Sequence, residues 1–255
     1  MKEFQASSEE VEFIGLNRNG EIVVVDESNE RNPSIQRWNT SGKQIQRFNV
    51  GQELGYTVLN RDKNLIAGTL ESEPDNSFTR LWDSSGTVIA EKLPGYLTEF
   101  SPKGESLATI DEKAGTVYLW RANGTLIREL PGYQGIKGAY FSADGQLVIV
   151  RHGDSVRSIW DISGRLVLNL PEMQGGVKSA WFSPTDSKLL VTVGNDGTIK
   201  LLRLDDRQTL LQTACNQIST YLQSEASDLS DSDRRLCDGI IPSPSQSPLN
   251  RRNSP

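Results

Sequence analysis

Arg37-Trp38-Asn39-Thr40-Ser41-Gly42 is the first occurrence of a phrase that decides the fold of this chain. It returns as Leu81-Trp82-Asp83-Ser84-Ser85-Gly86, Leu119-Trp120-Arg121-Ala122-Asn123-Gly124 and Ile159-Trp160-Asp161-Ile162-Ser163-Gly164. The tryptophans follow one another at intervals of 44, 38 and 40 residues. Such an interval indicates successive copies of one supersecondary unit, and it takes precedence over local signals.

A second marker accompanies the first along the chain. It is a large apolar residue followed by a short turn, as in Phe100-Ser101-Pro102-Lys103-Gly104. Its five lead residues lie 43, 41, 41 and 41 residues apart, at Leu16, Leu59, Phe100, Phe141 and Phe182. The two markers together divide a repeat region, residues 1–206, into units at about 11–50, 56–95, 96–132, 133–175 and 176–206.

The third unit indicates how one repeat folds. Short segments rich in β-branched and aromatic residues, or alternating in polarity, predict four strands, at 97–100, 106–110, 116–120 and 125–130. Turn residues separate the segments, and Asn123-Gly124 is a strong hairpin signal. Both faces of the third strand carry apolar side chains, because Leu119 and Trp120 point to opposite sides. A small sheet of this kind needs a neighbour on each face, so the sequence predicts an all-β propeller of about five four-stranded antiparallel blades.

These residues resemble WD40 repeats, and the Asp/Asn-x-Ser-Gly turn after the tryptophan is similar to that of bacterial WD40 arrays. The resemblance covers about residues 10–206 and includes the run Asp196–Leu202. It implies an interaction platform, because such arrays often follow ATPase, kinase or protease domains in bacterial signalling proteins. The residues that carry it are repeat markers with a structural role: Trp38, Trp82, Trp120, Trp160, Phe100, Phe141 and Phe182.

The chain departs from the WD40 pattern in two ways. The Gly-His pair before the first strand of each repeat is absent, so the buried network of His, Asp and Trp cannot form, and we expect apolar packing alone to hold the blades. Leu202 stands where a fifth tryptophan is expected. Three ways of closing the propeller stay open: a five-bladed ring in which residues 3–9 complete the last blade, an open arc, or two arcs that combine.

The composition changes after the repeats. Apolar residues at helical spacing predict an amphipathic helix over 207–224, within a C-terminal helical cap at 207–240; a helix that binds a partner is the alternative reading. Ser230-Asp231-Ser232-Asp233 fits a capping box that opens a short helix through Cys237. Residues 241–255 are rich in Pro and Ser, which predicts a disordered tail.

Bulk properties exclude several classes of function. The net charge is −6 and the pI is near 5.0, which argues against a nucleic-acid binder. Neither a membrane-spanning apolar run nor a secretory leader is present, so we expect a cytoplasmic protein that does not insert into membranes. Cys215 and Cys237 have no CxxC or His partner nearby, so we expect neither a disulfide framework nor a zinc site.

The sequence offers little catalytic chemistry. Its one histidine, His152, lies in a predicted exposed loop, and one histidine is too few for most acid–base schemes. The carboxylates Asp228, Asp231 and Asp233 lack the spacing of a calcium loop and fit helix capping instead. We therefore expect a protein that is not an enzyme and that binds no cofactor and no metal.

Charge is distributed unevenly between the two rims of the predicted propeller. The loops between second and third strands hold ten acids against three bases, whereas the opposite rim is balanced. Solvated loops explain this excess; the alternative is an acidic docking rim that steers a basic protein partner in a salt-sensitive way. Charge reversal at Glu71, Glu73 and Asp75 would then slow association. The candidate rim residues are Asp26, Glu27, Glu30, Glu71, Glu73, Asp75, Asp111, Glu112, Tyr96, Tyr133 and Met173.

The sequence thus predicts a non-catalytic protein–protein interaction scaffold or sensor module built from WD40-like repeats, of the kind found in bacterial signalling. A shortened remnant of a larger WD40 protein is the main alternative, and a propeller hydrolase or lectin is a third. An open propeller is also expected to self-associate, because its end sheets are exposed.

Overall fold

The computed structural model describes residues 5, 11–29, 32–60, 62–70, 77–131, 134–153, 155–170, 176–205, 211, 214–215, 218, 220–222 and 230–238. The chain divides into two compact units, Met1–Arg203 and Leu204–Pro255. The repeats lie in the first unit and the two cysteines in the second.

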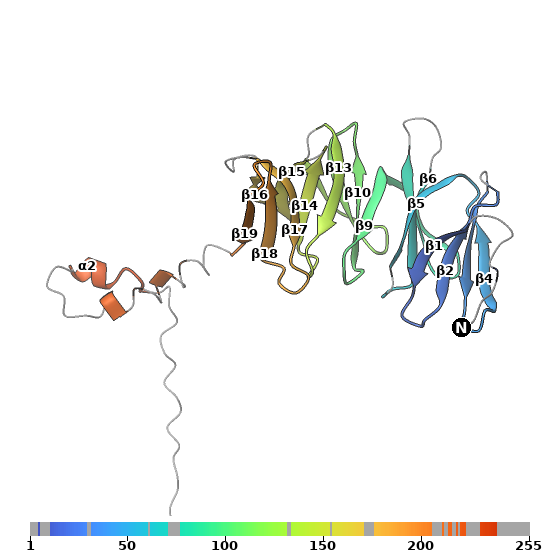
Figure 1. Ribbon diagram of the computed structural model, residues 1–255, viewed down its shortest axis with the longest axis horizontal. Coiled ribbons are helices and arrows are strands. Elements are labelled where there is room, and N and C mark those ends of the chain that lie inside the picture. The colour runs from blue at the N-terminus through green and yellow to red at the C-terminus, as the bar shows by residue number, and fades with distance from the viewer. Residues whose placement is uncertain are drawn as a thin grey trace, which may run out of the picture. The chain divides into compact units, whose positions relative to one another are not determined.

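The described strands of the first unit form five antiparallel sheets, each a meander in chain order (Figure 1). The first sheet contains β1 (Val11–Leu16), β2 (Ile22–Asp26), β3 (Ser34–Trp38) and β4 (Gln44–Asn49). The second contains β5 (Leu54–Asn60), β6 (Leu65–Leu70), β7 (Phe78–Trp82) and β8 (Val88–Pro94). The third contains β9 (Tyr96–Phe100), β10 (Ser106–Asp111), β11 (Thr116–Arg121) and β12 (Leu126–Pro131). The fourth contains β13 (Ile136–Phe141), β14 (Leu147–His152), β15 (Ser155–Asp161) and β16 (Leu166–Asn169), and the fifth β17 (Val177–Phe182), β18 (Leu189–Gly194) and β19 (Ile199–Arg203).

The predicted all-β architecture is confirmed, and the third sheet agrees with the predicted strands to within one residue at each end. The first strand of every sheet carries an irregularity in its pairing with the second, for example between Phe13 and Gly15 in β1. Such bulges increase the local twist of a sheet. Among the described strands the ring is not closed: the sheets follow one another from β1–β4 at one end to β17–β19 at the other (Figure 1).

The turns after Trp38, Trp82 and Trp160 are each built by one side-chain oxygen, whereas Arg121 occupies that position after Trp120. Asp161 Oδ1 accepts hydrogen bonds from the backbone N–H of Ser163 at 3.0 Å, from the Ser163 hydroxyl and from the N–H of Arg165 at 2.9 Å. Asn39 and Asp83 make the same three contacts in their own turns. The glycine that follows has a positive φ, 91° at Gly164. The Asp/Asn-x-Ser-Gly signature is therefore a turn motif with a direct local cause.

Asp161 is expected to make stability depend on pH. Burial, which raises the pKa of this carboxyl, is outweighed by hydrogen bonds from Ser163 and Arg165, which lower its pKa from 3.8 to about 2. Between these two pH values the folded state therefore binds fewer protons than the unfolded state. The stabilisation of the fold by ionised Asp161 is complete above about pH 4 and is lost as the pH falls towards 2. Denaturant titrations from neutral pH to about pH 2 should show that the free energy of unfolding falls less for Asp161→Asn than for the wild type. Asn39 already makes this turn, so the variant should keep its stability at neutral pH; an unchanged pH slope would contradict the assignment.

The hydrophobic core lies between the sheets. One cluster joins Ala108 and Leu119 of the third sheet to Phe141 and Val148 of the fourth, with Trp160 packed against it. Equivalent clusters join the first sheet to the second and the second to the third. The second and third sheets are thus apolar on both faces because each of their faces meets a neighbour, as the sequence predicts.

The expectation that apolar packing alone holds the blades is wrong. The Trp120 indole N–H donates to Thr109 Oγ1 at 3.0 Å, and that hydroxyl donates to the carbonyl oxygen of Pro94 at 2.6 Å. The Trp160 indole N–H donates to Ser158 Oγ at 2.8 Å, and that of Trp38 to Gln36 Oε1 at 3.1 Å. Short hydroxyl and amide side chains therefore replace the missing histidine as partners of the indole, since a buried indole N–H needs an acceptor.

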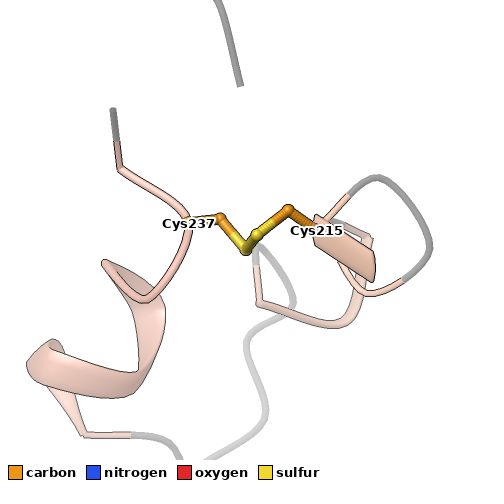
Figure 2. Close-up of a disulfide and its surroundings, with 2 residues drawn as sticks. All are labelled: Cys215 and Cys237. Carbon is orange, nitrogen blue, oxygen red and sulfur yellow. A yellow bond between two sulfur atoms is a disulfide. The ribbon is translucent and has the colours of Figure 1, made fainter. Parts of the chain in front are cut away.

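The second unit contains a disulfide that the sequence analysis did not expect. Cys215 and Cys237 are bonded, with their Cα atoms 5.6 Å apart (Figure 2). Cys215 has helical backbone, and Cys237 lies in the turn after α2 (Asp231–Arg234). The bond joins residues 22 apart, and constraining such a loop in the unfolded chain contributes roughly 3 kcal/mol. The two cysteines belong to no recognised motif, so the sequence did not indicate that they pair. Their pairing depends on how the two segments that carry them fold against each other.

The capping box before α2 is confirmed. Ser230 is the N-cap, its hydroxyl accepts from the backbone N–H of Asp233, and the Asp233 carboxylate accepts from the backbone N–H of Ser230. The helix ends at Arg234, earlier than the predicted end at Cys237. The longer predicted helix is helical at its described residues, which include Leu211, Ile218 and Leu222, but its role as a cap stays a prediction. The predicted tail and most of residues 3–9 lie outside the described part of the chain.

Candidate functional site

The described residues of the predicted acidic rim have different surroundings. Asp26 is 4% exposed; it accepts from Gln36 Nε2 at 2.7 Å and lies 3.6 Å from Arg47 Nη2. Its carboxylate thus satisfies polar groups inside the first sheet and is not presented to a partner. Glu27 beside it is half-buried. Six other candidates lie outside the described residues: Glu30, Glu71, Glu73, Asp75, Tyr133 and Met173.

The structure brings three rim candidates together around a cleft of about 360 Å³, the rim cleft. Tyr96, Asp111 and Glu112 line it, and so do Lys92 and Lys113. Glu112 also pairs with Lys137, with 2.7 Å between Nζ and Oε2. The rim cleft is therefore lined by both acidic and basic side chains. Its two lysines lie on the rim for which the sequence predicted an excess of acidic residues.

A second candidate region, which the sequence analysis missed, lies along the first strands of the sheets. A cleft of about 380 Å³ is lined by Tyr140 of β13, by Trp181 and Phe182 of β17, and by Glu99 and Arg151. Most of its other walls are Ile149, Val156 and Ala180, so we name it the apolar cleft. Trp181 is 57% exposed and Tyr140 39% exposed, which makes two aromatic rings available to a ligand.

A neighbouring cleft of about 350 Å³ shares Glu99 with the apolar cleft. Tyr56 of β5, which is 58% exposed, and Asp62 also line it. None of its described lining residues is a lysine or an arginine, so we name it the acidic cleft. Asp62 is paired at 2.7 Å with Arg18. Glu99 is therefore the carboxylate at the boundary of the two clefts.

Glu99 is positioned by a contact between sheets. Its Oε1 accepts a 2.6 Å hydrogen bond from the backbone N–H of Phe141 in β13. Burial raises the pKa of Glu99, while this hydrogen bond acts in the opposite direction. The pKa of Tyr56 is also raised, by burial and by the nearby Glu99, Tyr140 and Glu12. An acidic and aromatic group thus lies where a cation would gain from both a carboxylate and ring faces.

The repeat alignment carried a signal for these residues. Glu99, Tyr140 and Trp181 each immediately precede a lead residue of the second marker: Phe100, Phe141 and Phe182. In these three units that position is therefore occupied by large or charged side chains that packing within one sheet does not require, whereas Gly15 and Val58 occupy it in the first two units. The markers themselves are structural: Trp82, Trp120, Phe100 and Phe141 are each less than 10% exposed, and Trp38, Trp160 and Phe182 are half-buried.

His152 is not in an exposed loop, contrary to the expectation. It is the last residue of β14, pairs with Ile136 and Ser155, and is 6% exposed. β14 continues further than its sequence suggested, and this carries the imidazole into the interior. Within the described ranges, no group of three or more His, Cys, Asp or Glu side chains is placed to hold a metal ion. Nor does the described part of the chain include a helix of the length and apolar character that crossing a membrane requires.

The solved structures similar to this chain include two Hsv2 proteins, which are β-propellers. Hsv2 of Kluyvelomyces marxianus matches with a TM-score of 0.56 at 15% identity, over 75% of this chain and 59% of its own. KlHsv2 with loop 6CD replaced by a Gly-Ser linker matches with a TM-score of 0.57 at 16% identity, over 75% of this chain and 63% of its own. The chain thus spans less than two thirds of either protein. Such similarity shows the propeller fold alone; no family model and no curated protein matches the sequence.

Proposed function

We propose that the chain is a non-catalytic protein-interaction module that binds an extended basic and apolar segment of a partner along the first strands of its sheets. The observation that carries the proposal is the shared wall at Glu99, which joins an acidic cleft to an apolar one. A role in bacterial signalling rests on the WD40 resemblance alone and is part of the same proposal.

The acidic cleft supports recognition of a Lys or Arg side chain. A cation in it would lie near Tyr56 and Glu99, and a ring face with a carboxylate is a common cation site. The cation would also favour the ionised form of Glu99, whose pKa burial raises. We therefore expect binding to strengthen as the pH rises through that pKa. The net charge of −6 acts in the same direction at long range.

The apolar cleft supports recognition of a large apolar side chain beside the basic one. Tyr140 and Trp181 offer aromatic surface there, and exposed aromatic side chains of this kind often dominate binding energy. Arg151 at the same cleft disfavours a second basic residue in that position. The expected ligand is thus a segment with one basic residue next to a large apolar one.

Selection from a random peptide display library tests the proposal. Enriched peptides should carry Lys or Arg beside a large apolar residue, and their binding should weaken with salt. For the peptide that binds best, Tyr56→Ala and Glu99→Gln should each raise the Kd about tenfold, because each removes roughly 1–2 kcal/mol of cation binding. The measurement is a fluorescence anisotropy titration.

Tyr96→Ala is the matched control, because Tyr96 is an exposed tyrosine of the rim cleft. It should leave the Kd unchanged. Loss of binding in Tyr96→Ala with retention in Tyr56→Ala would place the partner on the rim and overturn the proposal. Enrichment of acidic peptides would also overturn it.

A cytoplasmic location is the remaining part of the sequence-based proposal, and the disulfide weighs against it. Cys215 and Cys237 are the two cysteines of the chain, and both are in the bond. Structural disulfides persist mainly in oxidising compartments. Thiol labelling of the protein in its native cells would decide between the compartments, since a reducing one leaves both thiols reactive.

A further inference from the structure

The junctions between consecutive sheets follow one rule. In each, a sheet contributes the face that carries residues such as Ala108 and Leu119, which we call its leading face. The next sheet contributes the face that carries its repeat tryptophan, which we call its trailing face. At the third junction Leu119 thus packs with Phe141 and Val148 against Trp160. The first two junctions have the same composition, with Trp82 and Trp120 on their trailing faces.

The leading face of the fifth sheet has no partner sheet among the described residues. Cross-strand pairing places Trp181, Val191 and Leu201 in one row and Val193 with Ile199 in the next, all on this face. Leu201 is 68% exposed and Ile199 72% exposed. The side chains at the position of Leu201 in the three preceding sheets are 0% exposed: Leu81, Leu119 and Ile159. The face therefore has the residues of a junction and lacks its other half.

The trailing face of the first sheet is the opposite half. Leu16 on it is 46% exposed, whereas the equivalent Phe100 and Phe141 are 9% and 7% exposed. Trp38 is only half-buried, whereas Trp82 is 2% exposed. Beside this apolar part, Gln36 Oε1 accepts from both Trp38 Nε1 and Gln44 Nε2, and Gln36 Nε2 donates to Asp26 Oδ2, so the amide of Gln36 is already satisfied. Gln36 can therefore be covered without leaving its amide unpaired.

We propose that the leading face of the fifth sheet binds the trailing face of the first sheet in a second copy of this chain. The contact repeats, between chains, the junction that the chain already makes between its own sheets. It is head-to-tail, so copies associate into a closed ring where the rotation closes and otherwise into a longer array. Contact between two fifth sheets would instead oppose two leading faces, a combination found at none of the described junctions.

Two variants separate the halves of the contact. Ile199→Glu with Leu201→Glu disables the leading face, and Leu16→Glu disables the trailing face; both place charges at exposed positions, so folding should persist. Trp181 is left unchanged because it also lines the apolar cleft, which keeps this test independent of the proposed function. Leu126→Glu, at a 42% exposed position of β12, is the matched control.

Light scattering after size exclusion, over a wide range of concentration, should give masses above the 28.2 kDa of one chain for the wild type and the control. Each face variant alone should remain a monomer, with association at least ~100-fold weaker, because burying an unpaired carboxylate is costly. Mixing the two face variants should restore one contact and give a heterodimer that grows no further.

Three results would overturn the proposal. A wild-type monomer at every concentration would mean that the faces stay free or close within one chain. Dimers of Leu16→Glu alone would indicate contact between two fifth sheets. Absence of a heterodimer in the mixture, with each variant folded by circular dichroism, would show that these two faces do not bind each other.

Discussion

Replacing Gly95 by alanine is expected to lower the free energy of unfolding by about 3 kcal/mol. Gly95 connects β8 to β9 and has a φ of +85°. A Cβ atom there would lie 2.3 Å from the carbonyl oxygen of Ile110 and 2.6 Å from its carbon. Both are backbone atoms inside the third sheet, so neither can move without disturbing the pairing of β10. Urea denaturation followed by tryptophan fluorescence measures the change.

Gly51→Ala is the control that separates the cost of the backbone conformation from the cost of the close contact with Ile110. Gly51 has nearly the same φ, +87°, but no atom lies within 4 Å of the position that its Cβ would take. Only the backbone conformation is then penalised, and we expect a loss of about 1 kcal/mol. Equal losses at Gly51 and Gly95 would show that the close contact with Ile110 contributes nothing.

Leu119→Ala is expected to cost about 3 kcal/mol, within the range of 2–5 kcal/mol typical of buried leucines. Leu119 is 0% exposed and lies at the junction of the third and fourth sheets. Because the two backbones are held by their own hydrogen-bond ladders, they cannot close fully on the cavity. The same urea titration measures the loss.

Leu126→Ala is the matched control in the same sheet. Leu126 of β12 pairs with Trp120 but is 42% exposed, so little apolar surface returns to water on its removal. We expect a change within about 0.5 kcal/mol. A comparable loss at both leucines would contradict the view that the core lies between the sheets.

The sequence by itself determined the blade. Strand, turn and tryptophan recur within about 40 residues, and each is specified by neighbours in the chain. The Asp161 side chain is an example, since its hydrogen bonds reach Ser163 and Arg165, no more than four positions away. Such contacts depend on local order alone, so a repeated phrase predicts a repeated structure.

The indole partners could be predicted only in part. The absence of Gly-His predicted that the WD40 network cannot form, but Thr109 and Ser158, which accept from two of the indoles, are unremarkable in sequence. Thr109 of β10 pairs with Tyr118 of β11, and Trp120 lies two residues further along β11 on the same face. Only this register brings the Thr109 hydroxyl within reach of the Trp120 indole. A one-residue shift of β10 against β11 would place the two side chains on opposite faces of the sheet.

Contacts between distant residues were decided by tertiary structure alone. Glu99 reaches Phe141 across 42 residues, His152 is buried by the continuation of β14, and Cys215 meets Cys237 without a motif. The exposure of Leu201, against the burial of Leu119 at the same repeat position, has the same origin. Which face of a sheet is covered depends on what packs beside it, and a repeating sequence is the same whether or not a neighbour is there.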